Sequence, residues 1–242
     1  MRAALAALAA GAALAAAAPA GAAPASGPRL AAGVLSDERT VTRWAHADVA
    51  ALARARPSAW ARPVARLRYY TEDGYPDVYL LLRRRIDAVG REWIRVRIAR
   101  RPNGQAGWVP RAALGPIHTV TAALVIDRRR LRATLYRAGR RVWSAPVGVG
   151  KRSTPTPAGR FWIRERFAVP GRTLYGPYAF GTSAYSRLSD WPRGGVVGLH
   201  GTDEPWLVPG RPSHGCIRLR NRDIRWLARG QRLPIGTPLR II

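Results

Sequence analysis

Short stretches of alternating apolar and polar residues, separated by turns rich in Gly and Pro, recur along most of this 242-residue chain. In the clearest of them, Ile94, Val96 and Ile98 alternate with tryptophan and arginine. A period of two is typical of a half-buried β-strand, because successive side chains of a strand point to opposite faces. Only one segment has the pattern of an amphipathic helix. The chain is therefore expected to be mainly β.

The C-terminal half carries most of the expected elements. Strands are expected at 123–127, 131–136, 142–149, 160–164, 195–200 and 238–242. The single helix is expected from Asn221 to Gly230, with Asp223 in its first turn and Asn221 as a possible cap. Residues 118–242 would form one unit of about 125 residues, which is large enough for an independent hydrophobic core.

A smaller unit of short strands and tight turns is expected at residues 36–115. Residues 101–104 (Arg-Pro-Asn-Gly) are a strong turn signal, and residues 107–110 (Gly-Trp-Val-Pro) indicate a short strand that ends at proline. Another strand is expected at 77–82. This combination resembles bacterial Src-homology-3-like domains, in which a Gly-Trp step follows an Asn-Gly turn. The resemblance implies a small β-barrel that binds or positions a partner and has no catalytic residue of its own.

The N-terminus resembles a secretory signal at residues 1–23. Arg2 precedes an apolar run of Ala and Leu, and Ala18-Pro19-Ala20 has the small residues of a cleavage site. A flexible linker of Gly, Ala, Pro and Ser is expected at 24–35. The alternatives are an Ala-rich tail or an uncleaved anchor, but the run is short for a membrane span of about 20 strongly apolar residues. We therefore expect an exported protein of the periplasm or cell wall, without a stable membrane span.

The formal net charge is +27, and nearly all of the positive charge comes from arginine. Such a chain attracts polyanions in a salt-dependent way. On charge alone, nucleic acid and an anionic cell envelope are equally good partners. The signal-like N-terminus disfavours nucleic acid, because export would take the protein away from it. Anionic cell-wall polymers are the expected partners.

The only cysteine, Cys216, lies in the run Ser-His-Gly-Cys-Ile-Arg at residues 213–218. It has no disulfide partner within the chain, and in an exported protein a lone thiol is a liability unless its reactivity is used. A nucleophilic cysteine needs a base or a local positive field. His200 ends an expected strand, and the loop 201–212 can return the chain to it, so His200 is the expected base. His214 is expected to shape the site.

The neighbours of this pair have expected roles of their own. Gly215 allows a tight turn in which the N–H groups of Gly215 and Cys216 form an oxyanion hole. The carbonyl of Gly201 is the expected acceptor for the second ring nitrogen of His200. Arg218 is expected to bind a substrate carboxylate. The alternatives are a solvated Arg218, Asn221 as a helix cap only, a buried inert thiol, or a zinc site of Cys216, His200, His214 and Asp203. A zinc site is disfavoured because the spacing is uncommon and a second thiolate is lacking.

These residues carry a resemblance to a known family. A His-Gly pair at 200–201, about a dozen further residues, and then Ser-His-Gly-Cys-Ile-Arg-Leu with a later Asn221 resemble the signature of the L,D-transpeptidase (YkuD-type) family. Residues 154–161 (Thr-Pro-Thr-Pro-Ala-Gly-Arg-Phe) are similar to a loop of that family. In many members the asparagine follows the cysteine sooner. The resemblance covers residues 118–242 and implies a β-barrel or sandwich with one C-terminal helix.

The family resemblance also implies an activity. Cys216 would attack the carbonyl of the third residue of a peptidoglycan stem peptide and release the terminal D-alanine. The side-chain amine of a third residue on a neighbouring stem would then resolve the thioester. Donor and acceptor stem peptides are thus the expected partners, with Ser213, Arg218 and Asn221 contacting substrate. No cofactor or metal is expected.

Several other activities remain open from the sequence. Water as the acceptor would make the protein an L,D-carboxypeptidase, and a protein acceptor would make it an anchoring enzyme. Papain-like wall endopeptidases place the cysteine before the histidine, and sortases have a much longer spacing from histidine to cysteine. A non-catalytic wall-binding protein is disfavoured by the intact set of His200, Gly215 and Cys216.

Overall fold

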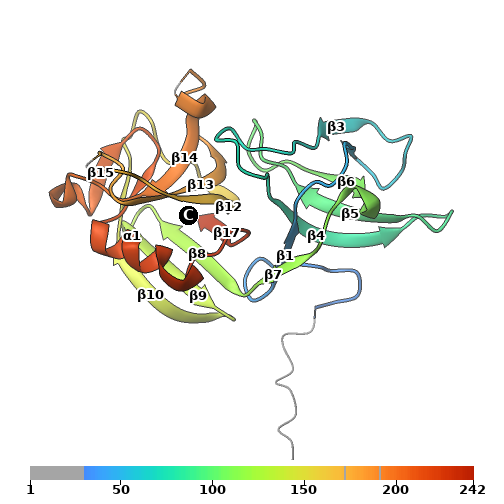
Figure 1. Cartoon of the computed structure of the whole chain (residues 1–242), viewed down its shortest axis with the longest axis horizontal. Helices are drawn as coiled ribbons and strands as arrows, with labels where there is room; N and C mark the ends of the chain where they lie inside the picture. Colours follow the sequence, from blue (N-terminus) through green and yellow to red (C-terminus); the bar gives the residue numbers. More distant parts are fainter. Residues whose placement is uncertain (1–29, 172, 191) are drawn as a thin grey trace, which may run out of the picture.

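The computed structural model describes residues 30–242, apart from residues 172 and 191, and its strands form two sheets that lie side by side (Figure 1). The expected signal at 1–23 and the first part of the expected linker lie outside the described residues. The linker was expected to reach residue 35, but Val34 forms a bridge with Arg83 and the Leu35 N–H donates to the Leu82 carbonyl at 3.0 Å. The expected flexible linker was therefore wrong for Val34 and Leu35, because these apolar residues pair with a strand of the first sheet.

The first sheet has seven strands in the order β3-β2-β6-β5-β4-β1-β7. Its strands are β1 (Thr42–Ala45), β2 (Leu52–Arg54), β3 (Pro63–Arg66), β4 (Tyr79–Ile86), β5 (Glu92–Arg97), β6 (Ala106–Pro110) and β7 (His118–Val120). The strands expected at 92–98 and 107–110 are confirmed as β5 and β6. The strand expected at 77–82 begins later and is longer, as β4. The likeness of this sheet to Src-homology-3-like domains stays a prediction.

The border between the two units lies slightly later than expected. Strand β7 pairs with β1, where His118 lies opposite Trp44 and Val120 opposite Thr42. The second sheet begins only with Ala122. The expected start of the second unit at 118 was therefore early by a few residues, because β7 completes the first sheet.

The second sheet has ten strands in the order β10-β9-β8-β17-β12-β13-β14-β16-β11-β15. Strand β10 lies at one edge, whereas β11, which follows it after Val147 alone, lies next to the other edge. The sheet must therefore curl upon itself. Its strands are β8 (Ala122–Asp127), β9 (Arg132–Arg137), β10 (Arg140–Pro146), β11 (Gly148–Gly150), β12 (Gly159–Ala168), β13 (Tyr178–Tyr185), β14 (Val196–His200), β15 (Gly210–Ser213), β16 (Ile217–Arg218) and β17 (Pro238–Ile241).

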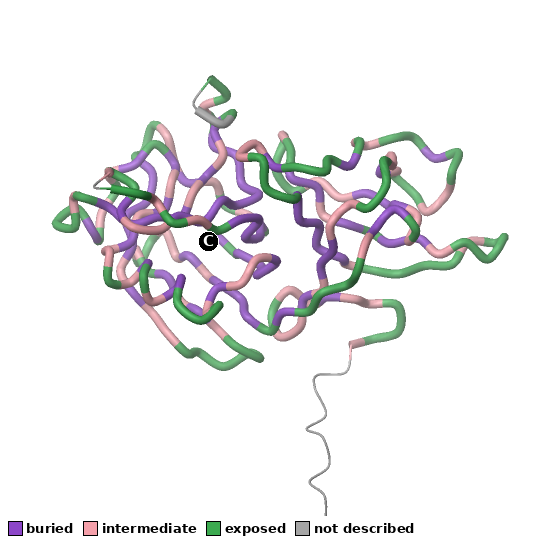
Figure 2. Tube along the Cα trace, viewed as in Figure 1, coloured by how far each residue is buried: buried purple, intermediate pink, exposed green. Residues whose placement is uncertain are grey.

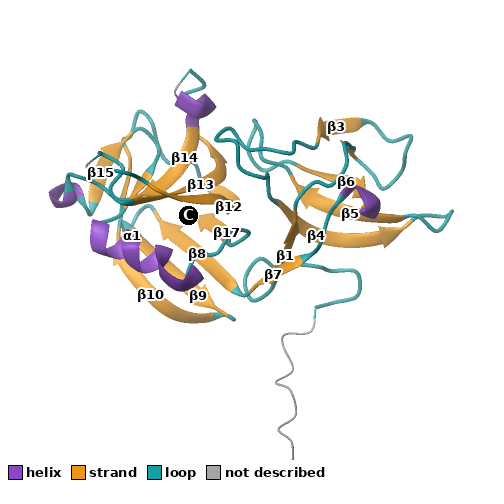
Figure 3. Ribbon diagram, viewed as in Figure 1, coloured by secondary structure: helices purple, strands orange, loops and turns teal. Residues whose placement is uncertain are grey.

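Helices are few among the described residues, and the fold is mainly β as expected (Figure 3). The α-helix is α1 (Asn221–Ala228), which buries Ile224 and Leu227 against the curled sheet. Short 3-10 turns are η1 (Arg111–Ala113), η2 (Pro192–Gly195), η3 (Pro205–Leu207) and η4 (Arg229–Gln231). Buried segments gather inside each lobe (Figure 2). Each sheet thus has its own hydrophobic core, and the larger core lies within the curl.

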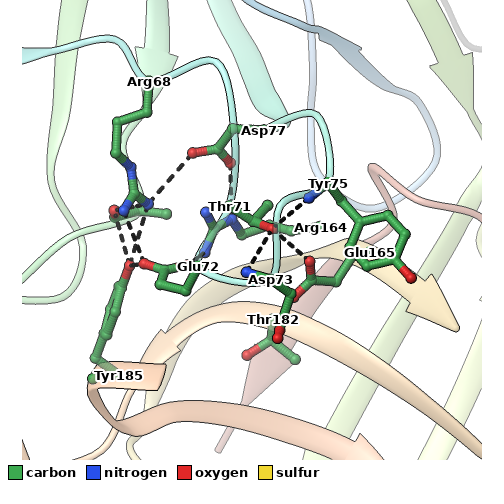
Figure 4. Close-up of polar contacts among 12 residues, drawn as sticks. Arg68, Thr71, Glu72, Asp73, Tyr75, Asp77, Arg164, Glu165, Thr182 and Tyr185 are labelled. Atoms are coloured by element: carbon green, nitrogen blue, oxygen red, sulfur yellow. Dashed lines mark hydrogen bonds and ion pairs between the residues drawn. The ribbon is translucent and has the colours of Figure 1, made fainter. Parts of the chain in front are cut away.

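A third apolar cluster joins the two sheets. Trp162 on β12 packs with Trp44 and Val78 from the first sheet, and its indole N–H donates to the Val78 carbonyl at 2.8 Å. Beside this cluster, charged and polar side chains of the loop 68–77 meet β12 and β13 (Figure 4). There the buried Arg164 guanidinium lies 2.9 Å from Asp77 and 2.9 Å from Glu72. The contact therefore combines apolar packing with paired charges.

Candidate active site

Cys216 and His200 are brought together by two paired strands, β14 and β16. These strands run parallel, with Leu199 opposite Ile217 and His200 opposite Arg218. Extending this register by one residue puts Cys216 opposite Gly198, and the Gly198 N–H donates to Cys216 Sγ at 3.4 Å. Side chains alternate along a strand, so Cys216 and His200 share one face while Leu199 and Ile217 point into the core. The predicted nucleophile and base therefore lie on the same side of the sheet.

Gly198 provides the space between them. A Cβ atom at this position would lie 3.6 Å from Cδ2 of His200 and 3.9 Å from Cys216 Sγ. The thiol and the imidazole therefore lie on either side of a residue without a side chain, and nothing from the strand separates them. A larger residue here would extend further between the two groups.

His200 is only 2% exposed, and its Nδ1 lies 2.6 Å from the Gly201 carbonyl oxygen. This contact was expected from the sequence and is present. Since a carbonyl accepts, Nδ1 carries the proton and Nε2 is left to accept one. Burial lowers the pKa of His200 to about 4, opposed by the Gly201 hydrogen bond and assisted by the positive charge of Arg218. At neutral pH the ring is therefore an uncharged base.

The turn before the nucleophile is held by two hydroxyl groups. The Ser213 hydroxyl donates to the Cys216 carbonyl at 2.6 Å and accepts from the Gly215 N–H at 3.1 Å. The Thr156 hydroxyl donates to the Gly215 carbonyl at 2.8 Å. Gly215 has a φ of 128°, which favours glycine. The role of Ser213 seen here is in the turn, and the Gly215 N–H is directed at Ser213, so the oxyanion hole and the substrate contact of Ser213 stay predictions.

Arg218 already has an acidic partner within the chain. Its guanidinium lies 2.7 Å from Glu204, whose side chain is 42% exposed. The Arg218 Nε is buried and has no hydrogen-bond partner among the described residues. This pair was not expected from the sequence. A carboxylate nevertheless occupies the place where substrate binding was expected.

Asn221 does not cap the helix. The N-cap position belongs to Arg220, and no side chain forms a cap hydrogen bond there. Asn221 Oδ1 instead accepts from the Thr202 N–H at 2.9 Å, and it packs so closely on Gly176 and Gly201 that neither leaves room for a Cβ. The cap alternative was therefore wrong, because the side chain turns back toward the segment after His200. Its contact with substrate stays a prediction.

Residues 121–241 match the L,D-transpeptidase catalytic domain family (YkuD), and this match covers half of the chain. The chain belongs to this family. The expectation from the Ser-His-Gly-Cys motif is thus confirmed at the level of the family. The match begins just after β7, at the same border that the sheets show.

Two curated relatives of this L,D-transpeptidase-family chain are YkuD of Bacillus licheniformis and ErfK/SrfK of Salmonella typhimurium, both named as L,D-transpeptidases. The first is 36% identical over 49% of this chain and 63% of its own length. The second is 30% identical over 55% of this chain and 48% of its own length. A solved L,D-transpeptidase from Mycobacterium tuberculosis is similar at 20% identity and a TM-score of 0.40, over 57% of this chain and 71% of that one. The chain thus spans about half to under two thirds of the curated relatives that it matches.

The site of this L,D-transpeptidase-family domain opens into a small pocket of about 60 Å³. The exposed His214 lines it together with Cys216, His200 and Arg218. Sequence reasoning missed its other walls, which are Leu174, Tyr175, Ser186, Val196 and Val197. The Tyr175 ring meets the His200 ring edge-on, with 4.9 Å between ring centroids. Leu174 and Tyr175 lie in the loop before β13, Ser186 directly follows β13, and Val196 and Val197 begin β14. No local pattern in the sequence marks these five as walls of the pocket, which Ser213 also lines.

Two further findings concern the described part of the chain. Across these residues, no three His, Cys, Asp or Glu side chains gather in a group that could hold a metal ion, so the four residues of the zinc alternative do not form one. No helix in residues 30–242, as described, is both long and apolar enough to cross a membrane.

Proposed function

We propose that this protein is a peptidoglycan L,D-transpeptidase that links third-position residues of stem peptides through a thioester on Cys216. The observation that carries the proposal is the placement of Cys216 Sγ and a neutral, buried His200 on one face of β14 and β16. Membership in the L,D-transpeptidase family supports the reaction class.

In the first half of the reaction, His200 Nε2 takes the proton of the Cys216 thiol. The thiolate attacks the carbonyl carbon of the third residue, and the C–N bond to D-alanine breaks. His200 returns its proton to the leaving amine. Because a thiol at its ordinary pKa is only slightly ionised at neutral pH, a base that starts uncharged is required for this step.

In the second half, the side-chain amine of a third residue on a neighbouring stem attacks the thioester. A new C–N bond forms, the C–S bond breaks, and the proton of the amine passes to His200 and then to the Cys216 sulfur. The enzyme returns to its starting state. Water in place of the amine would release a tripeptide stem instead.

Substrate binding is proposed to use the charge already present at the site. Arg218 binds Glu204 at 2.7 Å, and Glu204 is exposed enough to swing away. A stem-peptide carboxylate can therefore replace Glu204 on the guanidinium without leaving Arg218 unpaired. The net charge of +27 would concentrate the protein on carboxylate- and phosphate-bearing wall polymers. Export by the N-terminal segment is part of the same proposal.

The test is incubation of the protein with a disaccharide-tetrapeptide, followed by mass spectrometry. We expect a dimer that has lost one D-alanine, and no dimer with Cys216→Ala. Trimmed monomer alone would favour the carboxypeptidase. If neither product forms and a carbapenem leaves no adduct on Cys216, the enzymatic proposal fails and the non-catalytic wall-binding alternative is favoured.

A further inference from the structure

One turn of the first sheet reaches the active-site side of the second. This turn, residues 101–105, lies between β5 and β6, far from the catalytic strands in sequence. The Arg101 guanidinium donates to three backbone carbonyls of the catalytic domain: Gly194 at 2.7 Å, Ser186 at 2.9 Å and Leu188 at 3.2 Å. These carbonyls belong to the segment that joins β13 to β14. A single arginine thus binds both sides of that connection.

Asn103 adds a second hold on the same segment. Its side-chain N–H donates to the Tyr185 carbonyl at 2.8 Å, and its side-chain oxygen accepts from the Tyr185 N–H at 3.0 Å. The Arg101 guanidinium also lies 4.9 Å from the centre of the Tyr185 ring. Within the turn, the Gln105 side chain donates to the Arg101 carbonyl at 3.0 Å. The turn is therefore braced, and it contacts β13 at the residue where the strand ends.

The segment held by Arg101 borders the nucleophile. Ser186 and Val196 line the Cys216 pocket. A Cβ on Gly215 would lie 3.1 Å from the Ser186 Cβ, so the turn that carries Cys216 packs directly on Ser186. The Ser186 N–H donates to the Gly195 carbonyl at 2.8 Å, which closes the base of the connection. A displacement of Ser186 would therefore move Gly215 and the backbone of the proposed oxyanion hole.

Gly195 shows how closely the guanidinium fits. The φ of Gly195 is 74°, and a Cβ on Gly195 would lie 2.8 Å from the Arg101 Nη2 and would collide with the Leu188 carbonyl. The guanidinium thus fills the interior of the connection. Carbonyl oxygens that converge on one cation are held by charge as well as by geometry, and the planar fork of arginine suits three acceptors better than the single nitrogen of lysine.

We propose that Arg101, together with Asn103, is a positioning residue for the active site: the first sheet holds the wall of the Cys216 pocket in its working place. This inference rests on the proposed function only in taking Cys216 as the nucleophile. A position error of about 1 Å at reacting groups can lower a rate by about a hundredfold. Loss of the contacts that hold this pocket wall should therefore lower kcat.

The experiment compares Arg101→Ala, Arg101→Lys and Asn103→Ala with the wild type. Arg85→Ala is the matched control, because Arg85 is an exposed arginine on β4 of the same sheet. Hydrogen exchange is followed in peptides that cover 185–196 and 213–218, and kcat and KM are measured well below the thermal midpoint of each variant. We expect Arg101→Ala to speed exchange in both peptides and to lower kcat by about tenfold or more, with KM changed by less than about threefold.

Arg101→Lys should recover part of kcat, Asn103→Ala should show a smaller loss, and Arg85→Ala should match the wild type. The proposal is overturned if folded Arg101→Ala keeps wild-type kcat and wild-type exchange in 213–218. It is also overturned if exchange rises evenly over both sheets without any recovery by lysine, since that is the pattern of general destabilisation. The exchange comparison needs no transpeptidase activity, so it tests the positioning even if the proposed function fails.

Discussion

The contact between the sheets and the pocket around Cys216 both bury ionisable side chains, but they differ in how the charges are paired. At the contact between the sheets, the fully buried Arg164 guanidinium lies 2.9 Å from each of Asp77 and Glu72. At the proposed active site, the buried His200 ring is hydrogen-bonded to a backbone carbonyl and lies near the positive charge of Arg218. The first arrangement favours the charged forms of Arg164 and Glu72, whereas the second disfavours a charge on His200.

The pKa values show the same contrast. Burial alone would raise the pKa of Glu72, but Arg164 together with Tyr185 and Arg68 lowers it to about 2. The pKa of His200 is lowered to about 4, chiefly by burial and also by the positive charge of Arg218, which does not compensate for a buried charge on the ring. A perturbed pKa is therefore not enough to mark a catalytic group. Both pKa values are lowered, but this keeps Glu72 charged and His200 neutral. The charged carboxylate pairs with arginine and stabilises the fold, whereas the neutral imidazole has a nitrogen that can accept a proton.

The largest expected effect would come from removing the base. His200→Gln should lower kcat by about 10²–10⁴-fold, which is the usual contribution of a general base. The expected change in the thermal midpoint is small by comparison, because no buried charge loses a partner. The measurement is kcat of the folded variant on a tetrapeptide stem, with Cys216→Ala as the inactive reference. A kcat within tenfold of the wild type would remove His200 from the mechanism.

The contact between the sheets should show the opposite behaviour. Arg164→Met removes the fully buried cation from Asp77 and Glu72 and leaves them the partly exposed Arg68, which lies 3.4 Å from Asp77 and 2.9 Å from Glu72. The free energy of unfolding should therefore fall by about 3 kcal/mol, the low end of the usual cost of breaking a buried pair. Arg160→Met is the control on the same strand: its side chain is 65% exposed and its distance to Glu38 is 3.5 Å, so a loss of about 1 kcal/mol or less is expected. Urea unfolding compares the two. Equal losses would mean that the buried pairs contribute no more than a surface pair.

A smaller effect is expected when the charge beside His200 is changed. Arg218→Gln removes a positive charge, so the pKa of His200 should rise above its value of about 4. Glu204→Gln should move the pKa in the other direction, because Arg218 would lose its partner carboxylate. The chain has four histidines, so an NMR titration can follow His200 directly. A shift of the same sign in both variants would contradict the electrostatic argument.

The site could be predicted from sequence to the extent that its residues lie near one another along the chain. Cys216, the turn around Gly215 and the His200–Gly201 contact all follow from local pattern and one short return loop. Tyr175 and the Arg218–Glu204 pair could not be found in this way. Each depends on which loops the curled sheet brings to the pocket, and the Glu204 region carries no local signal for pairing.

The fold shows the same limit. Strand β5 was predictable because its apolar and polar residues alternate, and β6 because an Asn-Gly turn precedes it and Pro110 ends it. Strand β13 was missed, since all of its residues but the first are buried and no alternation is left to read. The charged contact between the sheets was also out of reach, because Arg164 and Asp77 are 87 residues apart. Pairing over such distances is set by how the two sheets dock.

The smallest expected effect concerns Glu165, a buried carboxyl of the contact between the sheets that lacks a strong cation partner (Figure 4). The pKa of Glu165 is raised from its ordinary value of 4.5 to about 7, chiefly by burial and also by Asp73, while the Thr71 hydroxyl and Arg164 oppose the rise. Between these two pH values the folded protein holds a proton here that the unfolded chain has lost. The contribution of this carboxyl to stability is thus present below pH 4.5 and is lost as the pH rises through about 7.

Glu165→Gln keeps a neutral side chain at every pH and should remove this dependence. The free energy of unfolding of the wild type minus that of the variant should therefore fall as the pH rises from 4.5 to about 7. His200 acts in the opposite direction over an overlapping range, because its lowered pKa makes the unfolded chain the better proton binder there. Only the difference between the two proteins isolates Glu165, since His200 is common to both. A difference that is flat with pH would mean that Glu165 ionises in the folded protein as it does in water, so that burial at the contact between the sheets does not disfavour its charge.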